Sequence, residues 1–327
     1  MKEKFHKKVF IGPMTLNVVN SVKKFNVNNN FFGLIPSRRQ IECSSMGNGY
    51  VNNWSTEKFK DYTTGTLVLR DHGGPNQGSH VDSGIQSLMG DINSGIDFIH
   101  IDPWKNSTSI EMSVESTARL INFCIDLNPE CHFEVGTESS IYPYDKKELK
   151  NFLGGLEKKL KSSFGNIVYG VVQSGTQVQG LGNIGKFDFQ KSKSMCEIVH
   201  EFGLKSKEHN SDYLSAQDIK DRISAGVDSF NIAPEFGVLE TKSIFKLLNQ
   251  NKELLEQFKL LAYNSKKWEK WVKHKPTILE AATICGHYVL STEEFLKIKK
   301  ALGDNNFDAY ITLEIDKKLK KIYKAMQ

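Results

Sequence analysis

Acidic and histidine side chains recur where short apolar segments of the sequence end. Asp71 and His72 directly follow the apolar run at residues 66–69, Glu134 lies in a later apolar segment, and His209 ends another. Any one of these histidines, taken alone, is more typical of a hydrogen-bonded structural residue. Two imidazoles and a carboxylate from separate strands, however, suit a divalent cation such as Zn²⁺, which takes His nitrogen and Asp or Glu oxygen. His72, Glu134 and His209 are therefore the candidate metal ligands.

Asp71 is the candidate for proton transfer. Adjacent strand residues point to opposite faces, so Asp71 and His72 share a pocket only if the strand bends, which the following Gly73-Gly74-Pro75 permits. Beside a cation, the carboxylate would move a proton while the metal charge stabilises a developing enolate. Capping of the next turn, or a salt bridge to Arg70, remains the alternative. Glu138 is a second catalytic candidate, although strand register leaves open which glutamate of its segment faces inward.

Two polar loops have the composition of an anion site. Residues 173–180 and 209–215 combine glycine, hydroxyl and amide side chains, as phosphate loops of α/β barrels often do. Arg38 and Arg39 are adjacent, so at most one is expected to face the pocket as a fork for phosphate or carboxylate, and surface salt bridges are the alternative. The substrate or phosphate-binding candidates from these observations are Arg38, Gln173, Ser174, Thr176 and Ser211.

These residues must be positioned by strands that alternate with helices. Eight short apolar segments fit strands, at residues 9–14, 31–36, 66–71, 98–102, 132–138, 166–175, 204–209 and 229–234. A stretch with helical periodicity follows each one, and Ser55 and Ser215 are suitable N-caps. Eight such units predict a (β/α)8 TIM barrel, in which the carboxyl ends of the strands face one pocket. A doubly wound open sheet is the alternative, but the loop after residue 14 lacks its GxGxxG turn.

The sequence beyond the eighth unit changes character. Residues 241–258 read as one helix, and further helices are expected at 264–274, 277–290, 291–302 and 313–326. We therefore predict a barrel over residues 1–258 and a C-terminal helical extension over 259–327 that packs on the barrel.

Composition limits the partners and the compartment. The net charge of +5 comes largely from lysines diluted with acidic and apolar residues, so no nucleic-acid partner is expected. No apolar run is long enough for a membrane span, and the basic start is followed by too short an apolar stretch for a signal peptide. The five cysteines show no CxxC spacing and read as reduced thiols. A cytoplasmic protein is the expectation.

Six short stretches, taken in order, resemble the class II, metal-dependent sugar-phosphate aldolase superfamily. They are RDHGGPN, FIHIDPW, FEVGTES, VVQSGT, KEHNSDYLS and SFNIAPEFG, spread over about residues 65 to 240. The closest group is the tagatose-bisphosphate aldolase class II accessory, or non-catalytic, subunit. The resemblance implies proton transfer by Asp71, metal binding by His72 and His209, an acidic position at Glu134, phosphate binding at Ser211 and substrate contact at Asn231.

The sequence departs from the catalytic members at the sixth strand. Where they place a further metal-binding histidine, this chain has Gln173, Ser174 and Thr176, a loss that it shares with the accessory group. Glu134 or Gln173 would then complete the ligand set. Zn²⁺ is the first choice of metal, and oxygen ligands would favour Mn²⁺ or Mg²⁺ instead.

The leading functional prediction is a metal-dependent, aldolase-type carbon-carbon lyase acting on a sugar or sugar phosphate through a metal-stabilised enolate. One alternative is a non-catalytic accessory subunit of a class II sugar-bisphosphate aldolase, and another is a sugar isomerase or epimerase on the same barrel. A Schiff-base mechanism through Lys207 ranks last, because Glu208 beside it would favour the charged amine. The protein partners left open are a second copy of the chain or a catalytic aldolase subunit.

Overall fold

The structure is a computed structural model that describes residues 7–303 and 306–327. The first six residues of the basic start, and residues 304–305 within the predicted helical extension, lie outside these ranges.

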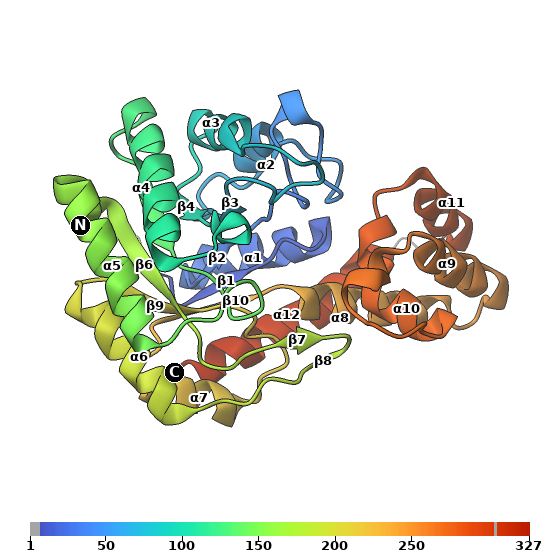
Figure 1. The fold of residues 1–327 in the computed structure, drawn as a ribbon. Helices are drawn as coiled ribbons and strands as arrows, with labels where there is room; N and C mark the ends of the chain where they lie inside the picture. Colours follow the sequence, from blue (N-terminus) through green and yellow to red (C-terminus); the bar gives the residue numbers. More distant parts are fainter. Residues whose placement is uncertain (1–6, 304–305) are drawn as a thin grey trace.

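Eight parallel strands form one sheet that curves into a barrel (Figure 1). Each predicted apolar segment supplies one of them: β1 (Val9–Ile11), β2 (Phe32–Leu34), β3 (Leu69–Gly73), β4 (Phe98–Ile101), β5 (His132–Val135), β6 (Ile167–Val172), β9 (Lys205–Glu208) and β10 (Ser229–Ile232). Hydrogen-bonded neighbours follow the order β2-β1-β10-β9-β6-β5-β4-β3. Parallel bridges from Leu34 to Val68 and from Ser37 to Asp71 bring β2 beside β3. The predicted TIM barrel is confirmed.

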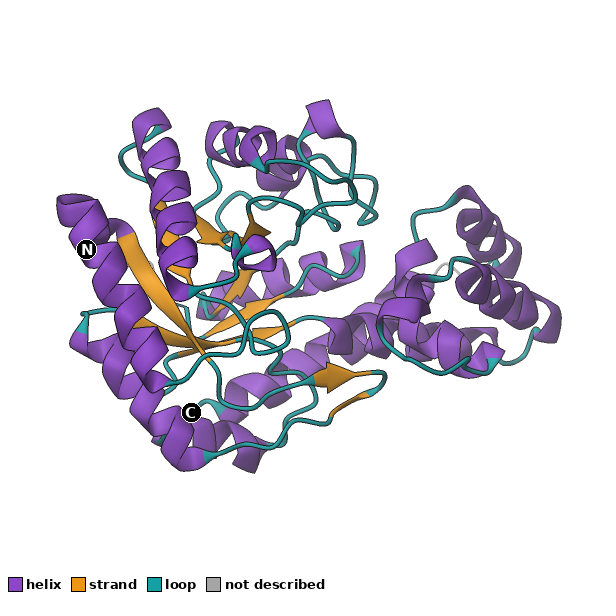
Figure 2. Ribbon diagram, in the orientation of Figure 1, coloured by secondary structure: helices purple, strands orange, loops and turns teal. Residues whose placement is uncertain are grey.

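Helices cover the outside of the barrel, as Figure 2 shows in purple around the orange strands. They are α1 (Leu16–Asn29), α2 (Thr56–Tyr62), α3 (Ile85–Asn93), α4 (Ile110–Leu127), α5 (Lys146–Leu160), α6 (Phe189–Glu201), α7 (Ala216–Ser224) and α8 (Pro234–Leu248). Ser55 caps α2 and Ser215 forms a capping box with Asp218 at α7, as their positions indicate. The loops contain short 3₁₀ turns, η2 (Ser44–Met46), η3 (Trp104–Asn106) and η4 (Lys161–Asn166), and a hairpin of β7 (Val178–Gln179) and β8 (Gly182–Asn183).

Apolar side chains fill the inside of the barrel. The inner cluster is separate from the larger core between the strands and the helices, and consists of Phe10, Ile35, Leu69, Phe98, Val168 and Tyr169. The rings of Phe10 and Tyr169 meet edge to face, with their centroids 5.9 Å apart. Because this cluster packs the barrel interior, functional groups are left to the strand ends and their loops.

The chain leaves the barrel wall after α8 and forms a lobe of helices. The lobe contains α9 (Lys252–Asn264), η5 (Lys267–Lys270), α10 (Ile278–Cys285), η6 (Gly286–Val289) and α11 (Glu293–Leu302). The chain then returns as α12 (Phe307–Ala325), which lies against α1, α7 and α8 (Figure 1). The division at residue 258 stays a prediction. Among residues 7–303 and 306–327, no helix has the length and apolar character needed to cross a membrane.

Two helix predictions in this region are wrong. Residues 241–258 do not form one helix, because Asn251 caps a new helix by accepting a hydrogen bond from the Leu254 amide. Residues 264–274 form only the short η5, since Lys266 takes a left-handed φ of 55° that interrupts helical geometry.

A buried carboxyl group where α8 meets α1 gives a pH-dependent stability. Glu240 of α8 accepts hydrogen bonds from Thr15 and Asn17, and burial raises its pKa to about 7. The folded protein therefore keeps this proton between pH 4.5 and 7 while the unfolded chain releases it, so stability falls as pH rises through this window. We expect the Glu240→Gln variant to lack this component, which is on the order of 3 kcal/mol.

Urea unfolding at pH 5 and at pH 7.5, for wild type and variant, measures this effect. The difference in free energy of unfolding between wild type and Glu240→Gln should change with pH. Parallel pH profiles of the two proteins would contradict the assignment of the shifted pKa to Glu240.

Candidate functional site

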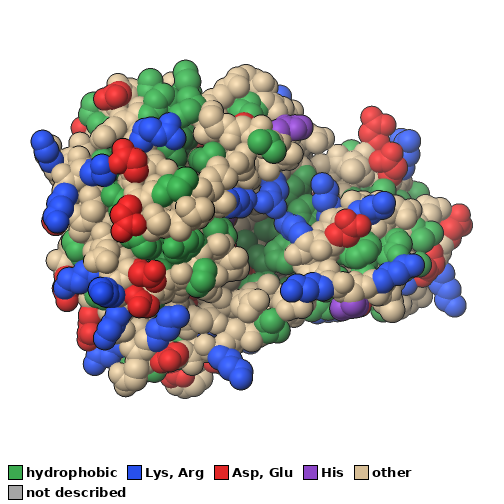
Figure 3. All heavy atoms as spheres, in the orientation of Figure 1, with side chains coloured by type: hydrophobic (Ala, Val, Ile, Leu, Met, Phe, Trp, Pro, Cys, Tyr) green, Lys and Arg blue, Asp and Glu red, His purple; other side chains and the backbone are tan. Residues whose placement is uncertain are grey.

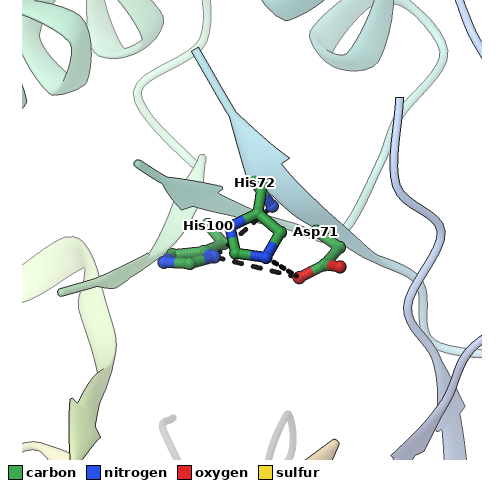
Figure 4. A group of neighbouring side chains, drawn as sticks. All are labelled: Asp71, His72 and His100. Carbon is green, nitrogen blue, oxygen red and sulfur yellow. Dashed lines mark hydrogen bonds and ion pairs between the residues drawn. The ribbon is translucent and has the colours of Figure 1, made fainter. Parts of the chain in front are cut away.

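Polar side chains from four strands meet at the carboxyl end of the barrel. Asp71 and His72 come from β3, His100 from β4 and Glu134 from β5, while His209 directly follows β9. Figure 4 shows Asp71, His72 and His100 turned toward one another. The ring of His209 lies with its centroid 5.7 Å from that of His72 and 4.9 Å from that of His100. The structure thus brings together residues that are far apart in the chain.

A local distortion of β3 lets two adjacent residues share this site. Leu69 belongs to the inner cluster and Arg70 points outward, where its guanidinium pairs with Asp91 of α3 at 2.5 Å. Asp71 then faces inward, and His72 would face outward in a regular strand. Instead His72 adopts a left-handed φ of 47°, and the pairing with β4 shifts register between Arg70 and Gly73. The bend thus begins at His72 itself, and Arg70 is not the partner of Asp71.

Each of the three imidazoles is held by a hydrogen bond through one ring nitrogen. His72 Nδ1 lies 2.5 Å from Asp102 Oδ2, and His100 Nε2 lies 2.9 Å from the carbonyl oxygen of Gly136. His209 Nε2 lies 2.5 Å from Glu134 Oε1. Such contacts fix ring orientation. The other nitrogens of His72 and His209 are then placed to bind a metal, whereas His100 Nδ1 already accepts a hydrogen bond of 3.4 Å from the His72 amide.

The opposite nitrogens face two carboxylates. His72 Nε2 lies 3.6 Å from Asp71 Oδ1 and 3.6 Å from Glu138 Oε1, and His209 Nδ1 lies 3.5 Å from Glu138 Oε2. Glu138 sits in the loop after β5, and this places it inward together with Glu134. His100 Nδ1 lies 4.0 Å from Asp71 Oδ1.

This donor set fits a divalent cation. Asp71 Oδ1 and Glu138 Oε2 are buried and have no hydrogen-bond partner in the described part of the chain. His72, Glu138 and His209 offer three ligand atoms within 4.8 Å of one another, and the same holds for Asp71, His72 and His100, and for His100, Glu134 and His209. Nitrogen with carboxylate oxygen is a ligand combination that Zn²⁺ and related ions accept.

Charges in the site favour ionised carboxylates. Burial alone would raise the pKa of Asp71, but the charges of His72 and the neighbouring imidazoles lower it by more. Burial would lower the pKa of His209, but Glu134 and Glu138 outweigh it and raise the pKa to about 9. His209 therefore holds a proton that a bound cation would displace.

Glu134 was predicted as a metal ligand, but both of its carboxylate oxygens contact protein side chains. Its Oε2 pairs with Lys207 Nζ at 2.6 Å, and its Oε1 bonds His209. Burial would raise the pKa of Glu134, but Lys207 and the imidazoles hold it well below the ordinary range. The Lys207 ammonium also lies 3.8 Å from the centre of the Phe10 ring. Glu134 thus connects a buried lysine to a site histidine.

The predicted substrate-binding residues fall into two groups. Arg38 is predicted to face the pocket, but its guanidinium is fully engaged by Glu42, Asp82 and the Gly74 carbonyl oxygen. Gln173 is engaged as well, donating to the carbonyl oxygens of Thr137 and Tyr142 and accepting from the Tyr144 amide; Ser174 and Ser211 both donate to the buried Glu208. Sequence could not reveal the distant partners, such as Asp82 for Arg38 and Glu208 for Ser174, because they come from other strands and loops.

The other two residues of that set are Thr176 and Asn231. Thr176 lines the cavity above the site, with its hydroxyl donating to the His209 carbonyl oxygen at 2.8 Å. Asn231 pairs with Phe10 across β10 and β1, so its side chain shares the inner face of the barrel. Both amide atoms of Asn231 are buried without a hydrogen-bond partner in the described residues.

An open cavity of about 460 Å³ lies over these groups, and its wall includes Asp71, His72 and Glu138. His100 and Asp102 of the β4 segment also belong to this site, although they were not among the candidate ligands, catalytic residues or substrate contacts. The alternation in the β4 segment FIHID was the available signal, because residues 98, 100 and 102 share one face of a strand.

Comparisons with known proteins identify the fold. No family model matches the sequence, and no curated protein matches it. A Sinorhizobium meliloti protein named a probable tagatose 6 phosphate kinase superposes with a TM-score of 0.79 and 12% identity over 98% of this chain and 100% of its own. Fructose-bisphosphate aldolase from Campylobacter jejuni superposes with a TM-score of 0.61 and 10% identity, over 99% of this chain and 91% of its own.

Fructuronate-tagaturonate epimerase UxaE from Cohnella laeviribosi gives a TM-score of 0.58 and 9% identity, over 96% of this chain and 81% of its own. Aldolases and an epimerase therefore share this barrel fold. These neighbours agree with the resemblance to sugar-phosphate aldolases, and identities this low establish the fold alone.

Proposed function

We propose that this protein is a divalent-metal-dependent enzyme that cleaves a carbon-carbon bond in a sugar or sugar phosphate. The observation that carries this proposal is the meeting of oriented imidazoles with two carboxylate oxygens, Asp71 Oδ1 and Glu138 Oε2, that have no hydrogen-bond partner among the described residues, at one open cavity. A barrel shared with aldolases supports the reaction class. The absence of disulfides among the five buried, free cysteines supports a cytoplasmic location.

In this proposal His72, Glu138 and His209 hold the cation. Glu138 replaces Glu134 in the ligand set, because both oxygens of Glu134 already have protein partners. Zn²⁺ is the first choice, with Mn²⁺ or Mg²⁺ as alternatives. When bound, the cation would supply positive charge that stabilises negative charge developing on a substrate carbonyl oxygen.

The protein's own groups then carry the proton and position the substrate. Asp71 Oδ1 takes the proton of the substrate hydroxyl; the carbon-carbon bond then breaks, and the carbon that carried the hydroxyl leaves as an aldehyde. Asp71 returns the proton to the enolate carbon of the second product, which leaves as a ketone. Asn231 and Thr176 contact the hydroxyl groups of the sugar chain. Asp102 and Glu134 keep His72 and His209 in orientation.

The test has two stages. Metal analysis of the purified protein comes first, followed by a cleavage assay over phosphorylated ketoses with and without a chelator. We expect about one divalent ion per chain and activity that the chelator abolishes and added metal restores. Protein that binds none of Zn²⁺, Mn²⁺ and Mg²⁺, and cleaves none of the ketoses, would refute the proposal.

Two alternatives have a specific observation behind them. The epimerase on the same barrel favours a proton-transfer reaction without cleavage, which the same assay would reveal as an isomeric product. Gln173, which stands on the sixth strand in place of a metal-binding histidine, favours an accessory subunit that stabilises a catalytic aldolase partner. Such a subunit would be inactive alone.

Removal of the Asp102 carboxylate should weaken metal binding. Asp102 holds His72 Nδ1 at 2.5 Å, so Asp102→Asn changes the acceptor that fixes the ring and its tautomer. Loss of such a partner typically lowers metal affinity by about 10- to 100-fold. Competition for the metal with a chromogenic chelator measures the affinity of the variant and of wild type.

Asp228→Asn is the matched control, because Asp228 bonds His200 at 2.7 Å in a similar pair outside the site. Equal metal affinity in Asp102→Asn and wild type would remove His72 from the proposed ligand set.

A further inference from the structure

Three positively charged side chains surround the mouth of the cavity over the candidate site. They are Arg39 from the loop after β2, Lys105 from η3 and Lys270 from η5 of the lobe, and all three are exposed and line the cavity. Figure 3 shows blue side chains gathered in the hollow between the barrel and the lobe. Separate parts of the chain thus place positive charge over one opening.

These charges are not balanced by ion pairs. Within the described residues, none of the three lies within 4.0 Å of a carboxylate oxygen, whereas the adjacent Arg38 is paired with Glu42 and Asp82. Lys105 donates only to the Asn76 carbonyl oxygen, at 3.2 Å. The arrangement leaves three cationic groups available to an anion from solution.

Electrostatics within the mouth agree with this arrangement. The Lys270 side chain is partly accessible, but its amine lies over the Trp271 and Tyr288 rings, where loss of solvation, and then the charges of Arg39 and Lys267, lower its pKa to about 7. Burial and Arg39 also lower the pKa of Lys105. Arg39 is therefore near enough to both lysines to repel them, and an anion between them would relieve that repulsion.

We propose that Arg39, Lys105 and Lys270 bind the phosphate group of the substrate. The proposal rests on the function inferred above, because the same cavity wall carries Asp71, His72 and Glu138. A chain-like substrate would then place its reacting carbons at the carboxylates and its phosphate among the three cations.

A phosphate ester fits this site better than a carboxylate. Three cations that converge from three segments match a tetrahedral dianion, which accepts hydrogen bonds on several sides and carries up to two charges. A sugar carboxylate is planar and singly charged, and one arginine fork satisfies it. The source of the anion is therefore taken to be a phosphate monoester.

The lobe contributes directly to this site. Lys270, Trp271 and Tyr288 line the cavity from the lobe side. The Trp271 carbonyl oxygen accepts a hydrogen bond of 3.2 Å from the Gly180 amide, in the turn between β7 and β8. Phosphate specificity would thus depend on the lobe as well as on the barrel.

Calorimetric titration with unreactive ligands tests the site without requiring catalysis. The ligands are a hexitol 6-phosphate, the unphosphorylated hexitol, and a hexonate that carries a carboxylate at one end. We expect wild type to bind the phosphate at least tenfold more tightly than the other two, and Arg39→Gln and Lys270→Gln each to lose that preference. The loss should shrink as salt is raised.

Lys273→Gln is the matched control, because Lys273 is exposed on the same segment but does not line the cavity. Equal affinity of wild type for hexitol and its phosphate, equal or tighter binding of the hexonate, or unchanged binding in both variants would each overturn the site. Because binding is read directly, a protein that binds the phosphate but neither metal nor cleavable ketose refutes only the proposed reaction.

Discussion

Replacing Asp71 with asparagine is expected to lower kcat for ketose-phosphate cleavage by on the order of 10²- to 10⁴-fold, the usual contribution of a positioned proton-transfer group. Asparagine keeps the size of the side chain but cannot accept a proton at this position. Asp71 Oδ1 is buried, lacks a hydrogen-bond partner among the described residues and lies 3.6 Å from His72 Nε2. It is thus held ready beside the proposed cation.

Steady-state kinetics together with the metal content of the same preparation measure this effect. We expect metal content and KM to change much less than kcat, because the proposed ligands are His72, Glu138 and His209. An Asp71→Asn variant that keeps both its metal and its activity within a few-fold of wild type would exclude Asp71 from proton transfer. A variant that loses its metal would instead place Asp71 among the ligands.

Lys207→Met is expected to destabilise the fold by about 3–5 kcal/mol, which is typical when one partner of a buried ion pair is removed. Lys207 Nζ pairs with Glu134 Oε2 at 2.6 Å, and both side chains are fully buried. The variant leaves the Glu134 carboxylate inside the barrel with two imidazoles as partners, His209 at 2.5 Å and His100 at 3.9 Å, and it also removes the cation above the Phe10 ring. Urea unfolding at neutral pH gives the free-energy difference.

Lys205→Met is the matched control on the same strand. Lys205 is exposed and reaches Asp228 only at 3.8 Å, so its loss should cost less than about 1 kcal/mol. A similar small cost for Lys207→Met would show that the buried pair contributes little. Addition of Glu134→Gln to Lys207→Met should recover part of the stability, because it removes the unpaired charge.

The barrel was predictable because its signals are local. Each β-rich apolar segment, such as 98–102, is followed by a helix, and most of these helices begin at a capping side chain that is visible in the sequence, such as Ser109 at α4. The helical lobe was less predictable. The apolar pattern of residues 241–258 continues through the break, so periodicity alone predicts one helix; the signal against it was Asn251, since asparagine favours helix caps over helix interiors.

The sequence predicted where the site lies better than it predicted the role of each residue in it. The rule that strand ends converge brings Asp71, His72 and His209 together without knowledge of the tertiary structure. It cannot tell which carboxylate oxygens are already occupied, because the partner of Glu134 comes from β9. The same limit applies to Arg38 and Arg39. The sequence did not show that Arg38 would be engaged by Asp82, more than forty positions away, which leaves the adjacent Arg39 to face the cavity.

The lobe is an insertion between two helices of the barrel wall, because the chain leaves the wall after α8 and returns to it as α12, which contacts α8. Its entry and exit are both anchored in the barrel, so the intervening segment is free to vary in length and content while the eight-stranded scaffold stays the same. Grafting a different segment between these anchors would therefore be a direct route to new substrate preferences, with Asp71 and Glu138 left untouched.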